Sequence, residues 1–168
     1  MKTIHLSYPH HIANINTDGD LSLAIGFFDG IHLGHQSVIS KAKDLAQEKG
    51  IKLAVMTFDP HPSIVLGKRN EQVFYITPME QKLRLLESME VDIVFVVRFT
   101  SDFAKLSPQE FIEKFIVDLN VKYVTAGFDF SFGSFGQGSM DTMQELSEGR
   151  YEVNVVQKKT DETEKISS

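Results

Sequence analysis

Two histidines, His32 and His35, are the residues best suited to chemistry. They stand in a glycine-rich string, Gly-Phe-Phe-Asp-Gly-Ile-His-Leu-Gly-His, at positions 26–35. The string follows an apolar segment of strand length and precedes a helical pattern. Unpaired N–H groups and the dipole at a helix start attract anions, and imidazoles three residues apart can project to the same side. Imidazole N–H groups can donate to phosphate oxygens and stabilise charge that develops there. We therefore predict that this string binds a triphosphate.

Two other interpretations of the histidine pair are weaker. Surface histidines that happen to flank a turn would explain an isolated pair, but not the whole string between a strand and a helix. A zinc site would need further ligands, and the chain contains no cysteine. The lack of cysteine also excludes a thiolate nucleophile and a disulfide framework.

A second string, Phe-Asp-Pro-His-Pro, occupies positions 58–62 and also follows an apolar segment. Its two prolines restrict the backbone and would hold Asp59 and His61 in defined places. A rigid turn with a capping Asp explains the same residues. This string alone therefore does not decide between a structural and a functional role.

A third string, Ala-Gly-Phe-Asp-Phe-Ser-Phe-Gly-Ser-Phe-Gly-Gln-Gly, occupies positions 126–138. Glycine permits unusual backbone angles, and phenylalanine rings can line a slot for a flat ligand. Asp129 could then meet a ring edge, a hydroxyl group or Mg²⁺. The alternative is a loop whose phenylalanines only anchor it to a small core.

The elements around these strings must position them. Apolar segments predict strands at 21–27, 53–58, 93–97, 122–126 and 151–156. Helical patterns cover 34–49 and 140–147, and two capping boxes, at 77–80 and 107–110, each open a helix. This alternation favours an α/β fold, doubly wound, with a mainly parallel sheet and helices on both faces. Ligands of such sheets bind outside the carboxyl ends of the strands, which is where all three strings are expected.

Composition limits the class of protein. The chain has 168 residues, 42% of them hydrophobic and 24% charged, which is typical of one globular domain. Its apolar stretches are too short to span a membrane and its N-terminus lacks the core of a signal peptide, so we expect a cytoplasmic protein with no membrane partner. A net charge of −6, from 17 basic and 23 acidic residues, argues against nucleic-acid binding.

Taken together, the strings resemble a known family. Positions 26–35 resemble the HxGH signature of the nucleotidyltransferase superfamily, which has a Rossmann-like fold. The strings at 57–62, 103–111 and 127–138 narrow the resemblance to the N-terminal module of bacterial FAD synthetases, which also carry a riboflavin kinase domain. The resemblance covers nearly the whole chain. It implies an FMN adenylyltransferase that converts ATP and FMN into FAD and pyrophosphate with Mg²⁺, by in-line attack of the FMN phosphate on the α-phosphorus.

The resemblance also implies roles for individual residues. His32 and His35 would be catalytic, together with Asp129, which matches a position where family members carry Asn or Asp. The residues expected to bind ATP are Gly26, Phe27, Phe28, Asp29, Gly30, His32, Gly34, His35, Ser167 and Ser168. The residues expected to bind the flavin are Phe58, Asp59, Pro60, His61, Phe128, Asp129 and Phe130. No metal ligand is assigned.

The C-terminus departs from the family pattern. The family carries an Ile-Ser-Ser-Thr-x-x-Arg motif after the last strand, and positions 165–168 supply only its start. We expect a nucleotidyltransferase domain at 1–156, a polar tail at 157–168 cut within this motif, and a riboflavin kinase domain C-terminal to it. Because the missing Thr and Arg would contact ATP phosphates, we expect the chain by itself to be a weak or inactive enzyme.

Two alternatives stay open. Another HxGH adenylyltransferase, acting on pantetheine phosphate or nicotinamide mononucleotide, would share the first string but not the second or third. A flavin- or nucleotide-binding module without catalysis would fit the shortened motif.

Overall fold

The computed structural model describes residues 1–9, 15, 17, 19–28, 33–60 and 78–157, and in 33–35 the backbone alone. The strands are β1 (Lys2–Leu6), β2 (Leu21–Ile25), β3 (Lys52–Asp59), β4 (Ile93–Arg98), β5 (Val121–Gly127) and β6 (Glu152–Val156). The α-helices are α1 (Leu33–Lys49), α3 (Met79–Ser88), α4 (Ser101–Ala104), α5 (Pro108–Ile112) and α6 (Met140–Glu145). A π-helical turn, η2 (Glu113–Val117), continues α5, and a 3₁₀ turn, η3 (Ser134–Gly136), follows β5.

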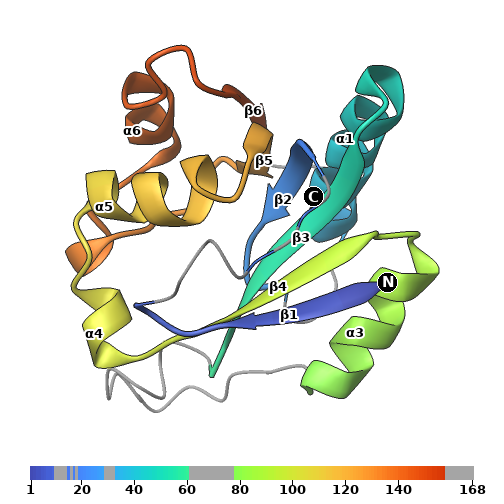
Figure 1. The fold of residues 1–168 in the computed structure, drawn as a ribbon, viewed down its shortest axis with the longest axis horizontal. Helices are drawn as coiled ribbons and strands as arrows, with labels where there is room; N and C mark the ends of the chain where they lie inside the picture. Colours follow the sequence, from blue (N-terminus) through green and yellow to red (C-terminus); the bar gives the residue numbers. More distant parts are fainter. Residues whose placement is uncertain (10–14, 16, 18, 29–32, 61–77, 158–168) are drawn as a thin grey trace, which may run out of the picture.

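The six strands form one sheet in the order β1-β4-β3-β2-β5-β6 (Figure 1). Every pair of neighbouring strands is parallel. All five residues of β2 are buried, as expected for a strand that is covered on both faces. The doubly wound α/β fold predicted from the sequence is confirmed.

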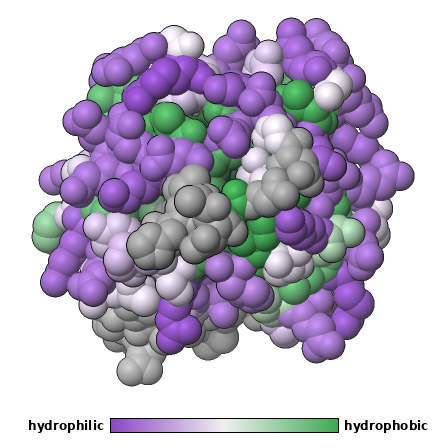
Figure 2. Space-filling view, in the orientation of Figure 1, coloured by the Kyte–Doolittle hydropathy of each residue, from purple (hydrophilic) through white to green (hydrophobic). Residues whose placement is uncertain are grey.

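Helices cover both faces of this sheet (Figure 1). On one face, Val38 and Ile39 of α1 and Leu86 of α3 pack in a core cluster with Val55 and Val94 of the sheet. On the other face, a second cluster joins Ile112 of α5, Phe115 of η2 and Met143 of α6 to the sheet. Hydrophilic side chains cover most of the face seen in Figure 2.

The order of the strands places a switch point between β2 and β5. The chain leaves β2 toward α1 and β3 on one side, whereas it leaves β5 toward α6 and β6 on the other. Connections that diverge from adjacent parallel strands leave a crevice outside the carboxyl ends. The first and third strings of the sequence both begin at this crevice.

The ends of the sheet and of the helices test further sequence-based predictions. Strand β1 was not expected; it pairs with β4 from Lys2↔Ile93 to Leu6↔Val97 at the edge of the sheet, and such a short, half-exposed strand has no long apolar run to reveal it. Helix α3 begins at Met79 with Pro78 as its N-cap. Thr77, whose side chain would complete the first capping box, lies outside the described residues, so that box stays a prediction. The second is confirmed: the Ser107 hydroxyl accepts from the Glu110 N–H at 3.1 Å, and the Glu110 carboxylate accepts from the Ser107 N–H at 2.9 Å.

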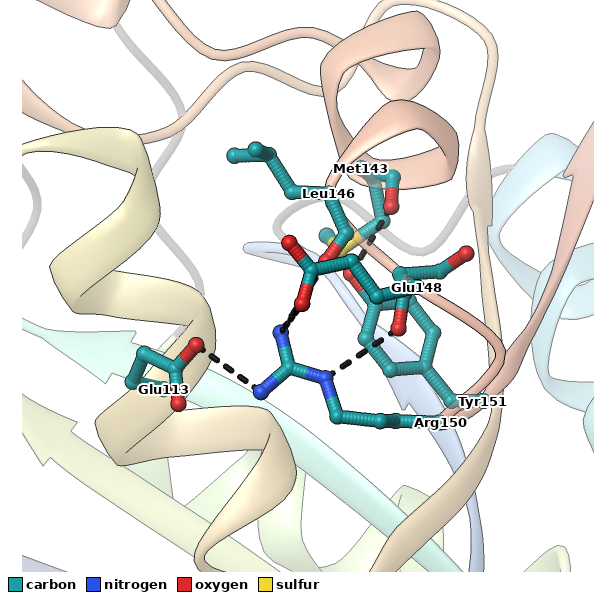
Figure 3. Close-up of polar contacts among 7 residues, drawn as sticks. Glu113, Met143, Leu146, Glu148, Arg150 and Tyr151 are labelled. Atoms are coloured by element: carbon teal, nitrogen blue, oxygen red, sulfur yellow. Dashed lines mark hydrogen bonds and ion pairs between the residues drawn. The ribbon is translucent and has the colours of Figure 1, made fainter.

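Polar contacts of Arg150 and Tyr151 join α6, η2 and the start of β6 (Figure 3). Arg150 donates to the Glu113 carboxylate at 2.9 Å and to the Leu146 carbonyl at 3.1 Å. The Tyr151 hydroxyl donates to the Met143 carbonyl at 2.7 Å. Because Arg150 satisfies a carbonyl at the end of α6, it also caps that short helix.

The buried Tyr151 predicts an alkaline loss of stability. Burial raises the pKa of its phenol from 10.0 to about 12 against the opposing effect of nearby Arg150. The unfolded phenol ionises first, so this contribution to the free energy of unfolding is present below pH 10 and is lost as the pH rises toward 12. We expect a loss of roughly 1–2 kcal/mol over that interval. Urea unfolding measured along a pH series checks it.

The test variant is Tyr151→Phe, and Tyr123→Phe, at a partly exposed tyrosine of β5, is its matched control. We expect Tyr151→Phe to lower the free energy of unfolding by about 1 kcal/mol at neutral pH, because it removes the hydrogen bond to Met143. We also expect this variant to lose less stability than the wild type as the pH rises above 10. A Tyr151→Phe protein with the wild-type pH profile would contradict the prediction.

Candidate active site

A cavity of about 720 Å³ opens beside the carboxyl ends of the strands, on the side of α4 and α5. Its volume is in the usual range for small-molecule sites. Eight phenylalanines line it: Phe27, Phe58, Phe99, Phe103, Phe111, Phe130, Phe132 and Phe135. Ser101, Lys105, Ser131 and Ser134 supply the polar side chains of the lining. We call this cavity the phenylalanine pocket.

The three strings described above meet at one wall of this pocket. The ring of Phe27, after β2, lies 5.2 Å from that of Phe58 in β3 and 6.4 Å from that of Phe130 after β5, measured between centroids. Phe103 of α4 extends the wall, with its centroid 5.9 Å from that of Phe58. These tilted rings make an apolar surface suited to a flat aromatic ligand.

Glycines of the third string hold its loop against the connection between α4 and α5. Gly133 has φ +81° and ψ −179°, a conformation almost confined to glycine. A Cβ at this position would come within 3.0 Å of the Pro108 nitrogen. The next N–H, that of Ser134, donates to the Leu106 carbonyl at 2.6 Å. The loop is thereby docked so that Phe130 and Phe132 turn inward and are buried.

The loop is also closed on itself. Phe132 and Gly138 form a two-way backbone bridge, with N···O distances of 2.8 and 3.1 Å. The Phe132 ring covers Gly138 so closely that a Cβ there would lie 2.6 Å from a ring carbon. Glycine is therefore required for this close approach.

The structure brings some of the sequence-predicted site residues into the pocket and leaves others outside its lining. Phe27, Phe58 and Phe130 line it. Asp59, Pro60 and Asp129 lie at the carboxyl ends of β3 and β5, and both aspartates are exposed. Phe128 is 46% exposed and is not part of the lining.

Gly26 and Phe28 have structural surroundings of their own. The Gly26 N–H donates to the Met56 carbonyl at 3.1 Å, which continues the sheet beyond β2. Phe28 is 2% exposed and packs in the cluster beneath α1 and α3, on the face opposite the phenylalanine pocket. Its φ of +57° turns the chain between the two faces.

Several expected site residues lie outside the described part of the chain. These are Asp29, Gly30, His32, His61, Ser167 and Ser168. Gly34 and His35 belong to the first turn of α1, where only the backbone is described. Their contacts stay predictions.

Other pocket residues were not predicted from the sequence. Phe103 lies in the short helix α4, where the Thr100 hydroxyl caps its N–H at 3.1 Å. Phe111 lies in α5, with its centroid 5.2 Å from that of Phe132. Both belong to the string at 103–111 that carried the family resemblance, and that was the only available signal for them.

A family profile described as FAD synthetase matches residues 14–168. This chain belongs to the FAD synthetase family. Its relatives include the bifunctional riboflavin kinase/FMN adenylyltransferases of Listeria monocytogenes, 49% identical, and Bacillus subtilis, 47% identical. Both alignments cover 100% of this chain and 53% of the relative. The chain therefore spans about half the length of these members of the FAD synthetase family.

Solved structures share the fold of this FAD synthetase family member. A protein from Streptococcus pneumoniae, described as a macrolide-efflux protein, superposes with a TM-score of 0.76 at 31% identity, over 96% of this chain and 52% of that one. A pantothenate synthetase from Thermus thermophilus superposes with a TM-score of 0.55 at 14% identity, over 96% of this chain and 63% of that one, which shows the fold alone. Among the residues that the structure describes, no helix is long and apolar enough to cross a membrane.

Proposed function

We propose that the protein containing this chain catalyses FMN adenylyltransfer at the site described above: ATP and FMN give FAD and pyrophosphate. The observation that carries the proposal is the phenylalanine pocket, which opens at the carboxyl edge beside the glycine-rich string of a FAD synthetase family member. A flavin is a flat aromatic ring system that carries a phosphate on a flexible chain. The pocket suits the ring system, and the neighbouring helix start suits phosphates.

The reaction needs positioned groups more than it needs a protein nucleophile. An oxygen of the FMN phosphate attacks the α-phosphorus of ATP, and a new P–O–P bond forms. The bond from the α-phosphorus to the bridging oxygen breaks, and pyrophosphate leaves with the electron pair. His32 and His35 at the start of α1 would donate hydrogen bonds to the ATP phosphates and stabilise the charge that develops on them.

Mg²⁺ fits this site as a companion of the substrate. Among the described residues, no group of three His, Cys, Asp or Glu side chains could form a protein cage for a metal. Mg²⁺ usually binds through one or two carboxylates together with substrate phosphates. Asp129 and Asp59, exposed at the carboxyl ends of β5 and β3, are the described carboxylates placed to assist. Bound there, Mg²⁺ would neutralise phosphate charge.

We also propose a wider setting for this domain. We infer that residues 1–156 form the transferase domain, that 157–168 begin the Ile-Ser-Ser-Thr-x-x-Arg segment, and that a riboflavin kinase domain follows in the full-length protein. The 53% coverage of the bifunctional relatives supports this arrangement. ATP and FMN are metabolites of the cytoplasm, where we expect the enzyme to act.

The proposal is tested by substrate choice. The full-length protein is incubated with ATP, Mg²⁺ and one of three acceptors: FMN, pantetheine phosphate or nicotinamide mononucleotide. We expect pyrophosphate only with FMN, together with a fall in flavin fluorescence as FAD forms. Pyrophosphate with another acceptor would support a different adenylyltransferase, and tight FMN binding without pyrophosphate would support a module that only binds.

Gly133→Ala tests the flavin pocket. The new Cβ would be forced against Pro108 in a backbone conformation that costs about 1–3 kcal/mol for other residues. We expect a lower free energy of unfolding and FMN binding weakened by about tenfold, because the shifted loop moves Phe130 and Phe132. Gly149→Ala is the matched control, since its φ is +75° but a Cβ there has nothing within 4 Å.

The measurements are urea unfolding and titration of FMN fluorescence. We expect Gly149→Ala to lower stability and leave FMN binding at the wild-type level. Equal FMN affinity in the two variants would remove the glycine-docked loop from the proposed flavin site.

A further inference from the structure

Lys82 is a buried lysine to which the proposed reaction assigns no role. It lies on α3, and only 2% of its surface is exposed. Taking an ammonium group out of water is costly unless hydrogen bonds replace those made to water. The Lys82 ammonium donates to the Phe27 carbonyl at 2.8 Å and lies 3.4 Å from the Thr57 hydroxyl. The burial of this charged side chain therefore indicates a role beyond packing.

The Phe27 carbonyl receives a second donor from the neighbouring strand. The Thr57 hydroxyl, fully buried in β3, donates to the same oxygen at 3.0 Å. Lys82, Thr57 and the Phe27 carbonyl thus form a cluster that joins α3, β3 and the end of β2, which we call the Lys82 cluster. Hydrogen bonds to charged groups are shorter and stronger than neutral ones, so Lys82 is its main anchor.

The Phe27 carbonyl lies where two consecutive side chains pack on opposite faces of the sheet. The Phe27 ring lines the phenylalanine pocket, whereas the ring of the next residue, Phe28, is buried beneath α1 and α3. The same backbone then continues toward α1 as the glycine-rich string. The Lys82 cluster therefore holds a peptide unit that belongs both to the proposed flavin pocket and to the described start of the proposed phosphate-binding string.

We propose that Lys82 is a positioning residue for adenylyl transfer: by holding the Phe27 carbonyl, it sets the start of the glycine-rich string, residues 26–28, relative to the flavin pocket, and through it the ATP expected to bind there. This inference rests on the proposed function. The Phe27 ring is itself held by contacts with Phe58 and Phe130. Loss of Lys82 should therefore disturb the placement of ATP more than the binding of FMN.

The test compares Lys82→Met, Thr57→Val and the double variant in the full-length protein. Methionine fills similar space without a donor, and each single variant removes one of the two described donors of the Phe27 carbonyl. We expect Lys82→Met to lower kcat by about tenfold or more and to raise the KM for ATP, with the Kd for FMN within about threefold of wild type. Thr57→Val should have a smaller effect in the same direction. The double variant should lose more kcat than the product of the two single losses, because it removes both described donors of the carbonyl at once.

Arg84→Met is the matched control on the same helix. Arg84 is 68% exposed on its side chain, and its contact with Glu80, at 3.6 Å, is a surface ion pair. We expect wild-type kcat and KM from this variant. Thermal unfolding of every variant shows which of them are folded at the assay temperature.

Each outcome bears on the inference. A folded Lys82→Met protein with kcat within twofold of wild type would overturn it, and so would an equal loss of FMN and ATP binding. If Lys82→Met does not fold, Thr57→Val decides: a rise in the KM for ATP at constant FMN affinity supports the inference, and wild-type kinetics overturns it. A wild-type protein that forms no FAD would overturn the proposed function instead, and calorimetric binding of ATP by the variants would then still test the positioning role.

Discussion

Replacing His32 or His35 with alanine is expected to lower the rate of FAD formation by roughly a hundredfold or more while the fold survives. Both residues lie in the glycine-rich string that leads from β2 into α1, at the helix end that attracts anions. As the α-phosphorus is attacked, negative charge grows on the transferred group and on the leaving pyrophosphate. Imidazole donors there would act on the transition state, so we expect their loss to appear mainly in kcat.

The measurement is steady-state FAD formation by the full-length protein, with far-ultraviolet circular dichroism to confirm folding. His5→Ala is the matched control, because His5 is an exposed residue of the edge strand β1, paired with Val96 of β4. We expect this control to retain wild-type kcat. A loss of less than about fivefold in both His32→Ala and His35→Ala would remove the pair from catalysis and with it the chemistry proposed for the string.

Removal of divalent cations is expected to abolish turnover, which is the largest effect predicted for this protein. The proposed reaction brings a triphosphate and a second phosphate together on a chain whose net charge is −6. Two imidazoles and one helix start carry too little positive charge for this, and a bound Mg²⁺ would supply more of it.

The test adds excess chelator to an active assay and then restores Mg²⁺. Turnover should stop and then return, while the thermal unfolding temperature of the free protein should stay the same, because the ion accompanies the substrate. Equal rates with and without chelator would contradict a Mg²⁺-dependent reaction. A protein that unfolds on chelation would point to a structural ion instead.

The phenylalanine pocket shows which parts of the site were open to sequence reasoning. Phe58 and Phe130 belong to strings that follow predicted strands, so an argument about the carboxyl edge of a parallel sheet could reach them. Phe103 and Phe111 come from α4 and α5, and no spacing in the sequence connects them to Phe58. Their place in the lining depends on how the crossover from β4 to β5 packs on the sheet, which is a long-range contact.

Lys82 shows the same limit more sharply. A lysine in an amphipathic helix is expected on the solvent side, because periodicity records only which residues share a face. In the structure, α3 lies so close to the end of β2 that Lys82 is buried and donates to the Phe27 carbonyl. The donor and acceptor are 55 residues apart in the chain, so no local pattern could have predicted the contact.

The sequence by itself determined the α/β class, the interior strands with their helices, the second capping box and the family, since these depend on apolar periodicity, helix-end chemistry and short strings of residues. Only the tertiary structure decided the strand order that puts the switch point between β2 and β5, the edge strand β1, and the convergence of eight phenylalanines on one pocket. The physical reason is that strand pairing and the packing of helices on a sheet are set by contacts between residues far apart in the chain, whereas a sequence pattern reports each segment's preference in isolation.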